Sequence, residues 1–89
     1  MQIRFNRIFV KQYQRAGRKI KSTFDYRLQL FQKDIYNPIL NNHSLTGEYK
    51  YCRSININGD WRAIYREDRE NDEIVITFLA LGTHSKLYR

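Results

Sequence analysis

The sequence has few of the residues that mark several common classes of protein. Its only cysteine, Cys52, excludes an internal disulfide framework and agrees with a reducing compartment. One cysteine and two histidines also fall short of the four ligands of a usual structural zinc site. The chain has neither the run of about 18 apolar residues that spans a bilayer nor an N-terminal signal-peptide segment. We therefore expect a cytoplasmic protein that does not enter a membrane and needs no metal or cofactor.

Acidic residues are also scarce, and most of them gather where a hairpin loop is predicted, over residues 66–73. Acidic residues in such a loop are usually solvated turn positions, so they are not assigned a catalytic role or a metal. They are Glu67, Asp68, Glu70, Asp72 and Glu73. A glycine-rich phosphate loop, a Cys-His pair and a Gly-x-Ser-x-Gly elbow are missing as well.

Positive charge, in contrast, is abundant. The 16 lysines and arginines outnumber the 9 acidic residues and give the 89-residue chain a formal charge of +7. A field of this sign favours polyanionic partners, nucleic acid above all, although a merely soluble basic domain would have the same composition. The length allows one domain, residues 1–89, with a core so small that a tight protein partner would suit it.

Hydrophobic spacing predicts a short strand and then two helices. Residues 3–5 alternate in polarity, residues 7–16 carry apolar side chains at helical spacing, and Gly17 is placed at the C-cap of that helix. The apolar residues of the second helix step by three or four, and this helix should end near Tyr36. They are Ile20, Phe24, Leu28, Phe31 and Ile35.

Three further strands are predicted over residues 48–57, 61–66 and 74–81, the last of them apolar on both faces and therefore inside the sheet. Between the first two, a two-residue turn at Asn58 and Gly59 would mix apolar and charged side chains on each face. A three-residue loop that includes Asp60 avoids this and is preferred. It pairs Ile57 with Trp61, Ile55 with Ala63, and Asn56 with Arg62.

The predicted fold class is α+β, a single domain in the order β-α-α-β-β-β. A helical hairpin packs on one face of an antiparallel sheet, and the other face is partly open. Because two helices return the chain to its starting end, the strand that follows them is expected to run antiparallel to the first strand.

A small group of side chains has the chemistry of a metal-free ribonuclease. Singly, His43, His84, Asp60 and Arg62 have ordinary explanations as surface or turn residues. Together they offer groups to take a proton from a ribose 2′-hydroxyl, to hold the phosphate, and to protonate the departing 5′ oxygen. The arginine suits the phosphate because its planar fork stays charged. Tyr88 is a candidate for stacking on a base.

Four segments of the chain carry informative motifs: HSLTG at 43–47, RSI at 53–55, GDWRAIY at 59–65 and LGTHSKLY at 81–88. They span residues 43–88, about half of the chain, and the Gly-Asp-Trp-Arg and Gly-Thr-His-Ser-x-Leu-Tyr pair is the most specific part. Together these segments resemble a known family, the RelE superfamily of toxins and most closely its YafQ-like branch.

The resemblance implies a RelE-like fold and a bacterial toxin that cleaves mRNA in the ribosomal decoding site. It also implies a cognate antitoxin, through which alone operator DNA would be contacted. His43, Asp60, His84 and Tyr88 match the positions needed for activity in the YafQ-like pattern, with His84 as the general acid. Arg62 matches the phosphate-binding arginine of the wider superfamily.

One position departs from the pattern, since Asn56 stands where YafQ-like toxins have another histidine. Asparagine does not exchange a proton at neutral pH, so the general base is His43 or Asp60, or the activity is weak. Two other functions share the fold: a ParE-like toxin that poisons DNA gyrase, and an inactive module that binds its antitoxin and operator DNA. The histidines and Arg62 favour the nuclease.

A further set of cations is assigned to contacts with RNA and the ribosome, because the predicted helices carry positive charge on their exposed faces. It consists of Arg15, Arg18, Lys19, Lys21, Arg27, Lys33, Arg53 and Lys86.

Overall fold

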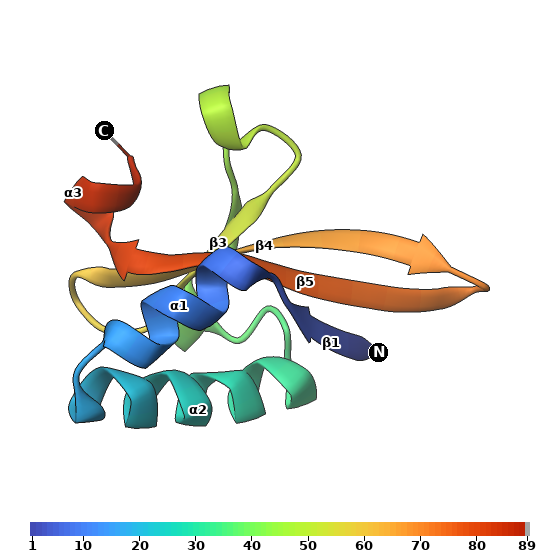
Figure 1. Cartoon of the computed structure of the whole chain (residues 1–89). Coiled ribbons are helices and arrows are strands. Elements are labelled where there is room, and N and C mark those ends of the chain that lie inside the picture. Colours follow the sequence, from blue (N-terminus) through green and yellow to red (C-terminus); the bar gives the residue numbers. More distant parts are fainter. Residues whose placement is uncertain (89) are drawn as a thin grey trace.

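The computed structural model describes residues 1–88 and confirms the α+β fold class. Helices α1 and α2 lie on one side of a five-stranded sheet, and α3 lies on the other (Figure 1). None of the helices within residues 1–88 is long and apolar enough to cross a membrane. The elements are β1 (Gln2–Phe5), α1 (Arg7–Arg15), α2 (Arg18–Lys33), the 3₁₀ helix η1 (Pro38–Leu40), β2 (His43–Ser44), the 3₁₀ helix η2 (Gly47–Tyr49), β3 (Arg53–Asn56), β4 (Trp61–Glu70), β5 (Glu73–Thr83) and α3 (His84–Leu87).

The strand order is β1-β5-β4-β3-β2, so β5 is an interior strand as predicted. Strand β1 pairs with β5 in parallel, and all other pairs are antiparallel. Consequently β3 runs in the same direction as β1, and the expected reversal between the strands before and after the helices is wrong for β3. The reason is the short strand β2, which does run opposite to β1, after which residues 45–52 reverse the chain once more.

Several predicted boundaries also need correction. Strand β3 begins only at Arg53, because residues 48–52 form η2 and a turn in which Tyr51 has a φ of 73°. The predicted loop over residues 66–73 is mostly strand, and a two-residue turn with φ values of 53° and 64° at Asn71 and Asp72 joins β4 to β5. At the end of α1 the C-cap is Ala16, whereas Gly17 is the N-cap of α2.

The three-residue loop between β3 and β4 is confirmed. Ile55 pairs with Ala63, Asn56 pairs with Arg62, and the backbone N–H of Ile57 donates to the carbonyl of Trp61 at 2.9 Å. The loop closes on the Asn58 side chain, whose Oδ1 accepts the N–H groups of Asp60 and Trp61 at 3.0 and 2.9 Å. This register puts Ile55 and Ala63 in the core and Arg62 on the opposite face.

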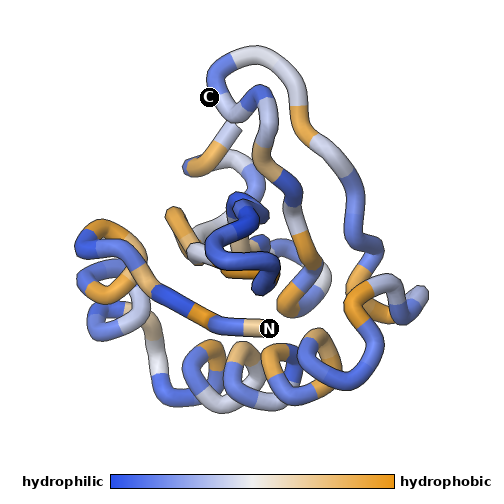
Figure 2. Tube along the Cα trace, turned by 90° about the vertical axis from the view of Figure 1, so that its right-hand side faces the viewer, coloured by the Kyte–Doolittle hydropathy of each residue, from blue (hydrophilic) through white to orange (hydrophobic). Residues whose placement is uncertain are grey.

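The main core lies between the sheet and helices α1 and α2. Phe24 and Phe31, from the predicted stripe of α2, are buried against Phe78 of β5, and Tyr65 packs beside them. Hydrophobic and hydrophilic segments alternate along this helix, which lies at the base of Figure 2. The apolar side chains that recur at a helical period therefore pack α2 against one face of the sheet. The candidate site lies on the other face.

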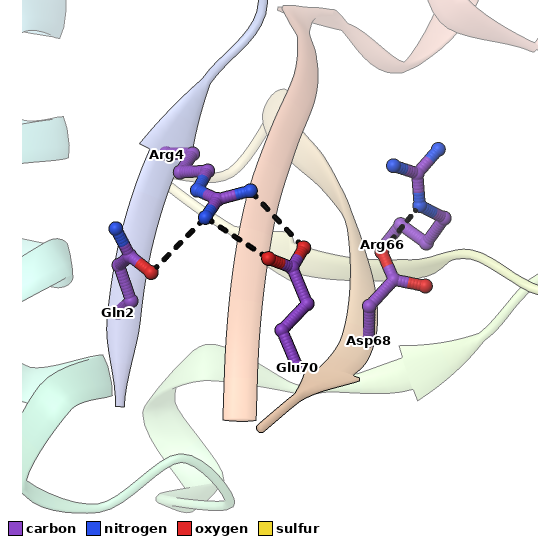
Figure 3. A network of polar contacts seen from close by, with 5 residues as sticks. All are labelled: Gln2, Arg4, Arg66, Asp68 and Glu70. Carbon is purple, nitrogen blue, oxygen red and sulfur yellow. Dashed lines mark hydrogen bonds and ion pairs between the residues drawn. The ribbon is translucent and has the colours of Figure 1, made fainter. Parts of the chain in front are cut away.

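An ion pair across β5 ties the edge strand β1 to β4. The two terminal nitrogens of Arg4 contact the two carboxylate oxygens of Glu70 at 3.1 and 3.2 Å, and one of them also donates to Gln2 (Figure 3). Arg66 and Asp68 form a second exposed pair at 2.8 Å. Such exposed pairs contribute at most about 1 kcal/mol each, so they orient the strands rather than hold them.

Candidate active site

An open hollow of about 300 Å³ brings together four of the five residues assigned to catalysis. His43 comes from β2, Arg62 from β4, His84 from α3 and Tyr88 from the residue after α3. The lining is completed by Asn41 and Leu45, to which the sequence assigned no role, although Leu45 belongs to the HSLTG segment. Residues far apart in the chain thus meet on one face of the sheet, which is what a shared phosphate contact requires.

His84 is placed by the way the chain turns from β5 into α3. Its backbone N–H donates to the carbonyl of Asp60 at 2.9 Å, and the Thr83 hydroxyl caps α3 by accepting the N–H of Lys86 at 3.4 Å. Gly82 leaves room for Leu87 of α3 to pack against β5, because a Cβ there would lie 3.2 Å from the Leu87 side chain. Asp60 therefore supports the hollow through its carbonyl, and its exposed side chain does not line it.

The proton on His43 is fixed by its backbone neighbour. The Nδ1 atom lies 2.8 Å from the carbonyl oxygen of Asn41, and a carbonyl accepts hydrogen bonds only. We therefore assign the ring proton to Nδ1, which leaves the lone pair of the neutral ring on Nε2. An exposed imidazole with a free Nε2 is suited to accept a proton from a ligand.

Arg62 is held by the loop that precedes it. One terminal nitrogen donates to the carbonyls of Asn58, Gly59 and Trp61 at 3.1, 3.3 and 3.1 Å. The other terminal nitrogen reaches only the Gly59 carbonyl, at 3.4 Å. The guanidinium is thus restrained at one end, while it still contributes to the lining of the hollow.

Tyr88 lines the hollow and lies between the rings of His84 and Tyr49. Its ring centre lies 4.7 Å from that of His84 and 6.0 Å from that of Tyr49, and its hydroxyl donates to Ser54 at 3.0 Å. Burial, with the charge of Glu48 and the neighbouring Tyr88 as smaller causes, raises the pKa of the Tyr49 hydroxyl. The Tyr49 hydroxyl therefore favours its neutral form, and its ring supports Tyr88, a contact that the strand interpretation of residues 48–57 had missed.

Comparison with protein families gives one decisive match. The model of a family described as "Bacterial toxin of type II toxin-antitoxin system, YafQ" matches residues 1–89. The chain belongs to this family. It is therefore a toxin of a type II toxin–antitoxin system, in agreement with the predicted resemblance. No match was found among curated protein sequences.

Solved structures show that the YafQ fold is shared. YafQ from E. coli strain BL21(DE3) superposes with a TM-score of 0.79 at 20% identity, over 99% of this chain and 98% of that one. YafQ in the E. coli DinJ-YafQ toxin-antitoxin complex gives a TM-score of 0.76 at 21% identity, over 99% and 97% of the two chains. A YoeB/ParE toxin from Agrobacterium tumefaciens gives 0.76 at 15% identity, over 94% and 99%. At these identities the similarity establishes the fold alone.

Asn56, the position where this YafQ-family chain departs from the expected histidine, lies on β3 directly opposite Arg62. Its side-chain Oδ1 is buried and has no hydrogen-bond partner within the part of the chain that the structure describes. Asn56 does not line the hollow. Two residues are candidates for the general base, His43 and Asp60. Of these, only His43 lines the hollow.

The cations assigned to RNA fall into three groups. Arg15, Arg18, Lys19 and Lys33 are exposed on the helical side of the sheet, away from the hollow. Three others have protein contacts: Lys21 lies 5.9 Å from the centre of the Tyr13 ring, Arg27 donates to the Ile57 carbonyl at 3.2 Å, and Arg53 donates to Asn42 at 2.8 Å. Lys86 is exposed on α3, beside the hollow.

Side chains that could bind a metal ion do not gather in the described part of this toxin. Within residues 1–88 no group of three His, Cys, Asp or Glu side chains is arranged to hold a metal ion. The groups that do line the hollow are two imidazoles, a guanidinium and a phenol, which transfer protons and bind anions.

Proposed function

We propose that this toxin is a ribosome-dependent endoribonuclease that cleaves mRNA by metal-independent acid–base chemistry. The observation that carries the proposal is the convergence of His43, Arg62 and His84 on one open hollow. A phosphate in that hollow would have a proton acceptor, a fixed cation and a proton donor within reach, and these are the groups that attack by a ribose 2′-hydroxyl requires.

The proposed reaction transfers one proton at each end of the displacement. Nε2 of His43 takes the proton of the 2′-hydroxyl, and that oxygen forms a bond to the adjacent phosphorus. The bond from phosphorus to the 5′ oxygen breaks, and protonated His84 gives its proton to that oxygen. Arg62 stabilises the charge that builds on the non-bridging oxygens. The products are a 2′,3′-cyclic phosphate and a 5′-hydroxyl.

His43 is preferred to Asp60 as the base for a geometric reason. The Asn41 carbonyl holds the proton on Nδ1 and leaves Nε2 free, whereas the exposed Asp60 carboxylate lies outside the hollow. With histidine as base, the asparagine at position 56 need not exchange a proton.

Three assays separate this function from its alternatives. Purified toxin added to ribosomes carrying a defined mRNA is expected to cut that mRNA, whereas a ParE-like toxin would leave it intact and give gyrase-dependent DNA breaks. An inactive module would do neither and would retain only its partners. Intact mRNA on ribosomes, at toxin concentrations that arrest growth, would refute the nuclease assignment.

The exposed cations of the helical side are expected to dock the toxin on ribosomal RNA. Replacing Arg15, Arg18, Lys19 and Lys33 by glutamine should weaken ribosome binding and reduce the slope of log K against log salt by about 3, because each phosphate contact contributes about 0.7–0.9. The measurement is a binding titration at several salt concentrations. Arg69→Gln on the β4–β5 hairpin is the matched control, and undiminished binding of the fourfold variant would show that these charges serve only solubility.

The toxin is also expected to bind a cognate antitoxin, as E. coli YafQ does in its complex with DinJ. Val10 lines an apolar groove of about 250 Å³ between α1, α2 and β1, which suits an amphipathic antitoxin helix. Coexpression with the neighbouring gene should yield a complex that copurifies and suppresses growth arrest, and contacts with operator DNA are expected only through that complex. Val10→Asp should weaken it and Gln29→Asp, exposed on α2, should not. Failure to copurify with the unchanged toxin would refute this partner.

A further inference from the structure

A second open hollow, of about 500 Å³, lies around the edge of β2 next to the candidate active site. Its lining includes two tyrosines and two cations, namely Tyr36, Tyr51, Lys50 and Arg53, and we call it the tyrosine hollow. Tyr36 is 60% exposed and Tyr51 is 82% exposed, so neither ring is used to fill the core. Large rings held open to solvent are available to a ligand.

Each tyrosine has a cation beside it. The Lys50 ammonium lies 5.2 Å from the centre of the Tyr51 ring, and the Arg53 guanidinium lies 5.6 Å from the centre of the Tyr36 ring. Arg53 is fixed through Nε, which donates to Asn42 at 2.8 Å, so its terminal nitrogens are oriented in advance. Glu67 is the one carboxylate in the lining, and the two cations outnumber it. The hollow therefore offers ring faces for a base and positive charge for a phosphate.

Tyr51 is the third residue of a type II turn, which the N–H of Cys52 closes by donating to the carbonyl of Tyr49 at 2.9 Å. Its φ of 73° is in the left-handed region, which bulky residues rarely adopt and which asparagine and glycine tolerate. The ring gains little burial in return, since it is the most exposed of the large hydrophobic side chains. The turn therefore fixes the backbone at Tyr51 and leaves its ring in solvent, where a ligand could contact it.

The tyrosine hollow borders the candidate active site at the edge of β2. Leu45 lines both hollows, and the adjacent residues His43 and Ser44 of β2 line one each. A single strand of RNA that crosses this edge would place neighbouring nucleotides in the two hollows. We propose that the tyrosine hollow is a subsite for a nucleotide next to the cleaved one, with the base stacked on a tyrosine and the phosphate on Lys50 and Arg53. This inference rests on the proposed ribonuclease function.

The test is an NMR titration of the ¹⁵N-labelled toxin with a trinucleotide that carries 2′-deoxyribose and therefore stays uncut. Resonances of residues 50–53 should shift together with those of His43, Arg62 and His84. Tyr51→Asn should weaken binding about five- to hundredfold, as expected for the loss of one stacked base. The same substitution should raise the melting temperature, because asparagine suits the backbone better than tyrosine does.

Two further variants make the result specific. Tyr51→Phe keeps the ring and should restore affinity to within about threefold. Tyr26→Asn removes a tyrosine of α2 that is 74% exposed and lines neither hollow, and it should have no effect on binding. Unshifted resonances at residues 50–53, or unchanged affinity of Tyr51→Asn, would overturn the subsite. Neither result would touch the ribonuclease proposal, which depends on cleavage of ribosome-bound mRNA by the unchanged toxin.

Discussion

Replacing His84 by alanine is expected to lower the single-turnover rate of mRNA cleavage on the ribosome by about 10²–10⁴-fold, the usual contribution of a general acid. The physical reason is that the Tyr88 hydroxyl, the neighbouring donor in the lining of the hollow, already donates to Ser54 and is not free to replace it. Ribosome binding should be nearly unchanged, because His84 lies across the sheet from the cations of the helical side. The rate is measured with toxin in excess over programmed ribosomes.

Ser85→Ala provides the control for His84→Ala, since Ser85 is the next residue of α3 and is exposed. It should cut at the rate of the unchanged toxin. If His84→Ala also cut at that rate while remaining folded, His84 would not be the general acid.

Arg62→Ala is expected to reduce the same rate by about 10²–10³-fold, because it removes charge stabilisation that is realised mainly in the transition state. Arg62→Lys should recover little of the loss. An ammonium lacks the planar fork with which Arg62 contacts the carbonyls of Asn58, Gly59 and Trp61 while it lines the hollow.

Arg66→Ala is the matched control, as Arg66 is an exposed arginine of the same strand that pairs with Asp68. Thermal unfolding separates a loss of chemistry from a loss of structure, since the loop carbonyls lose their donor in Arg62→Ala. A folded Arg62→Ala toxin with full cleavage would exclude a role for this guanidinium at the phosphate.

Much of the fold could be predicted because the informative patterns were long or strongly constrained. The stripe through Phe24 and Phe31 fixed the face of α2, and the loop over residues 58–60 followed from keeping Ile55 and Ile57 on the apolar side. The strand directions could not be predicted in the same way. They depend on the two-residue strand β2 and on the parallel pairing of β1 with β5, for which the sequence has no local signal.

The candidate site could likewise be predicted only in part. His43, Arg62 and His84 were chosen by residue type and resemblance, and their convergence depends on β2 and α3, which are too short to be predicted from periodicity. The hydrogen bond from the His84 N–H to the Asp60 carbonyl joins two backbone groups, so the types of the two residues do not predict it. Tyr51 was misinterpreted because Tyr49 and Tyr51 alternate with polar residues as strand residues do, whereas a positive φ at Tyr51 turns the chain.

The central claim is that the 2′-hydroxyl of the message is the nucleophile. The most direct measurement uses a ribosome-bound mRNA with a single 2′-deoxyribose immediately 5′ of the scissile phosphate, compared with the all-ribose message. We expect the all-ribose message to be cut to a 2′,3′-cyclic phosphate and the single substitution to abolish cleavage at that bond. Cleavage of the deoxy-substituted bond at the unmodified rate would mean that water or a metal-bound hydroxide attacks, and would contradict the acid–base mechanism assigned to His43, Arg62 and His84.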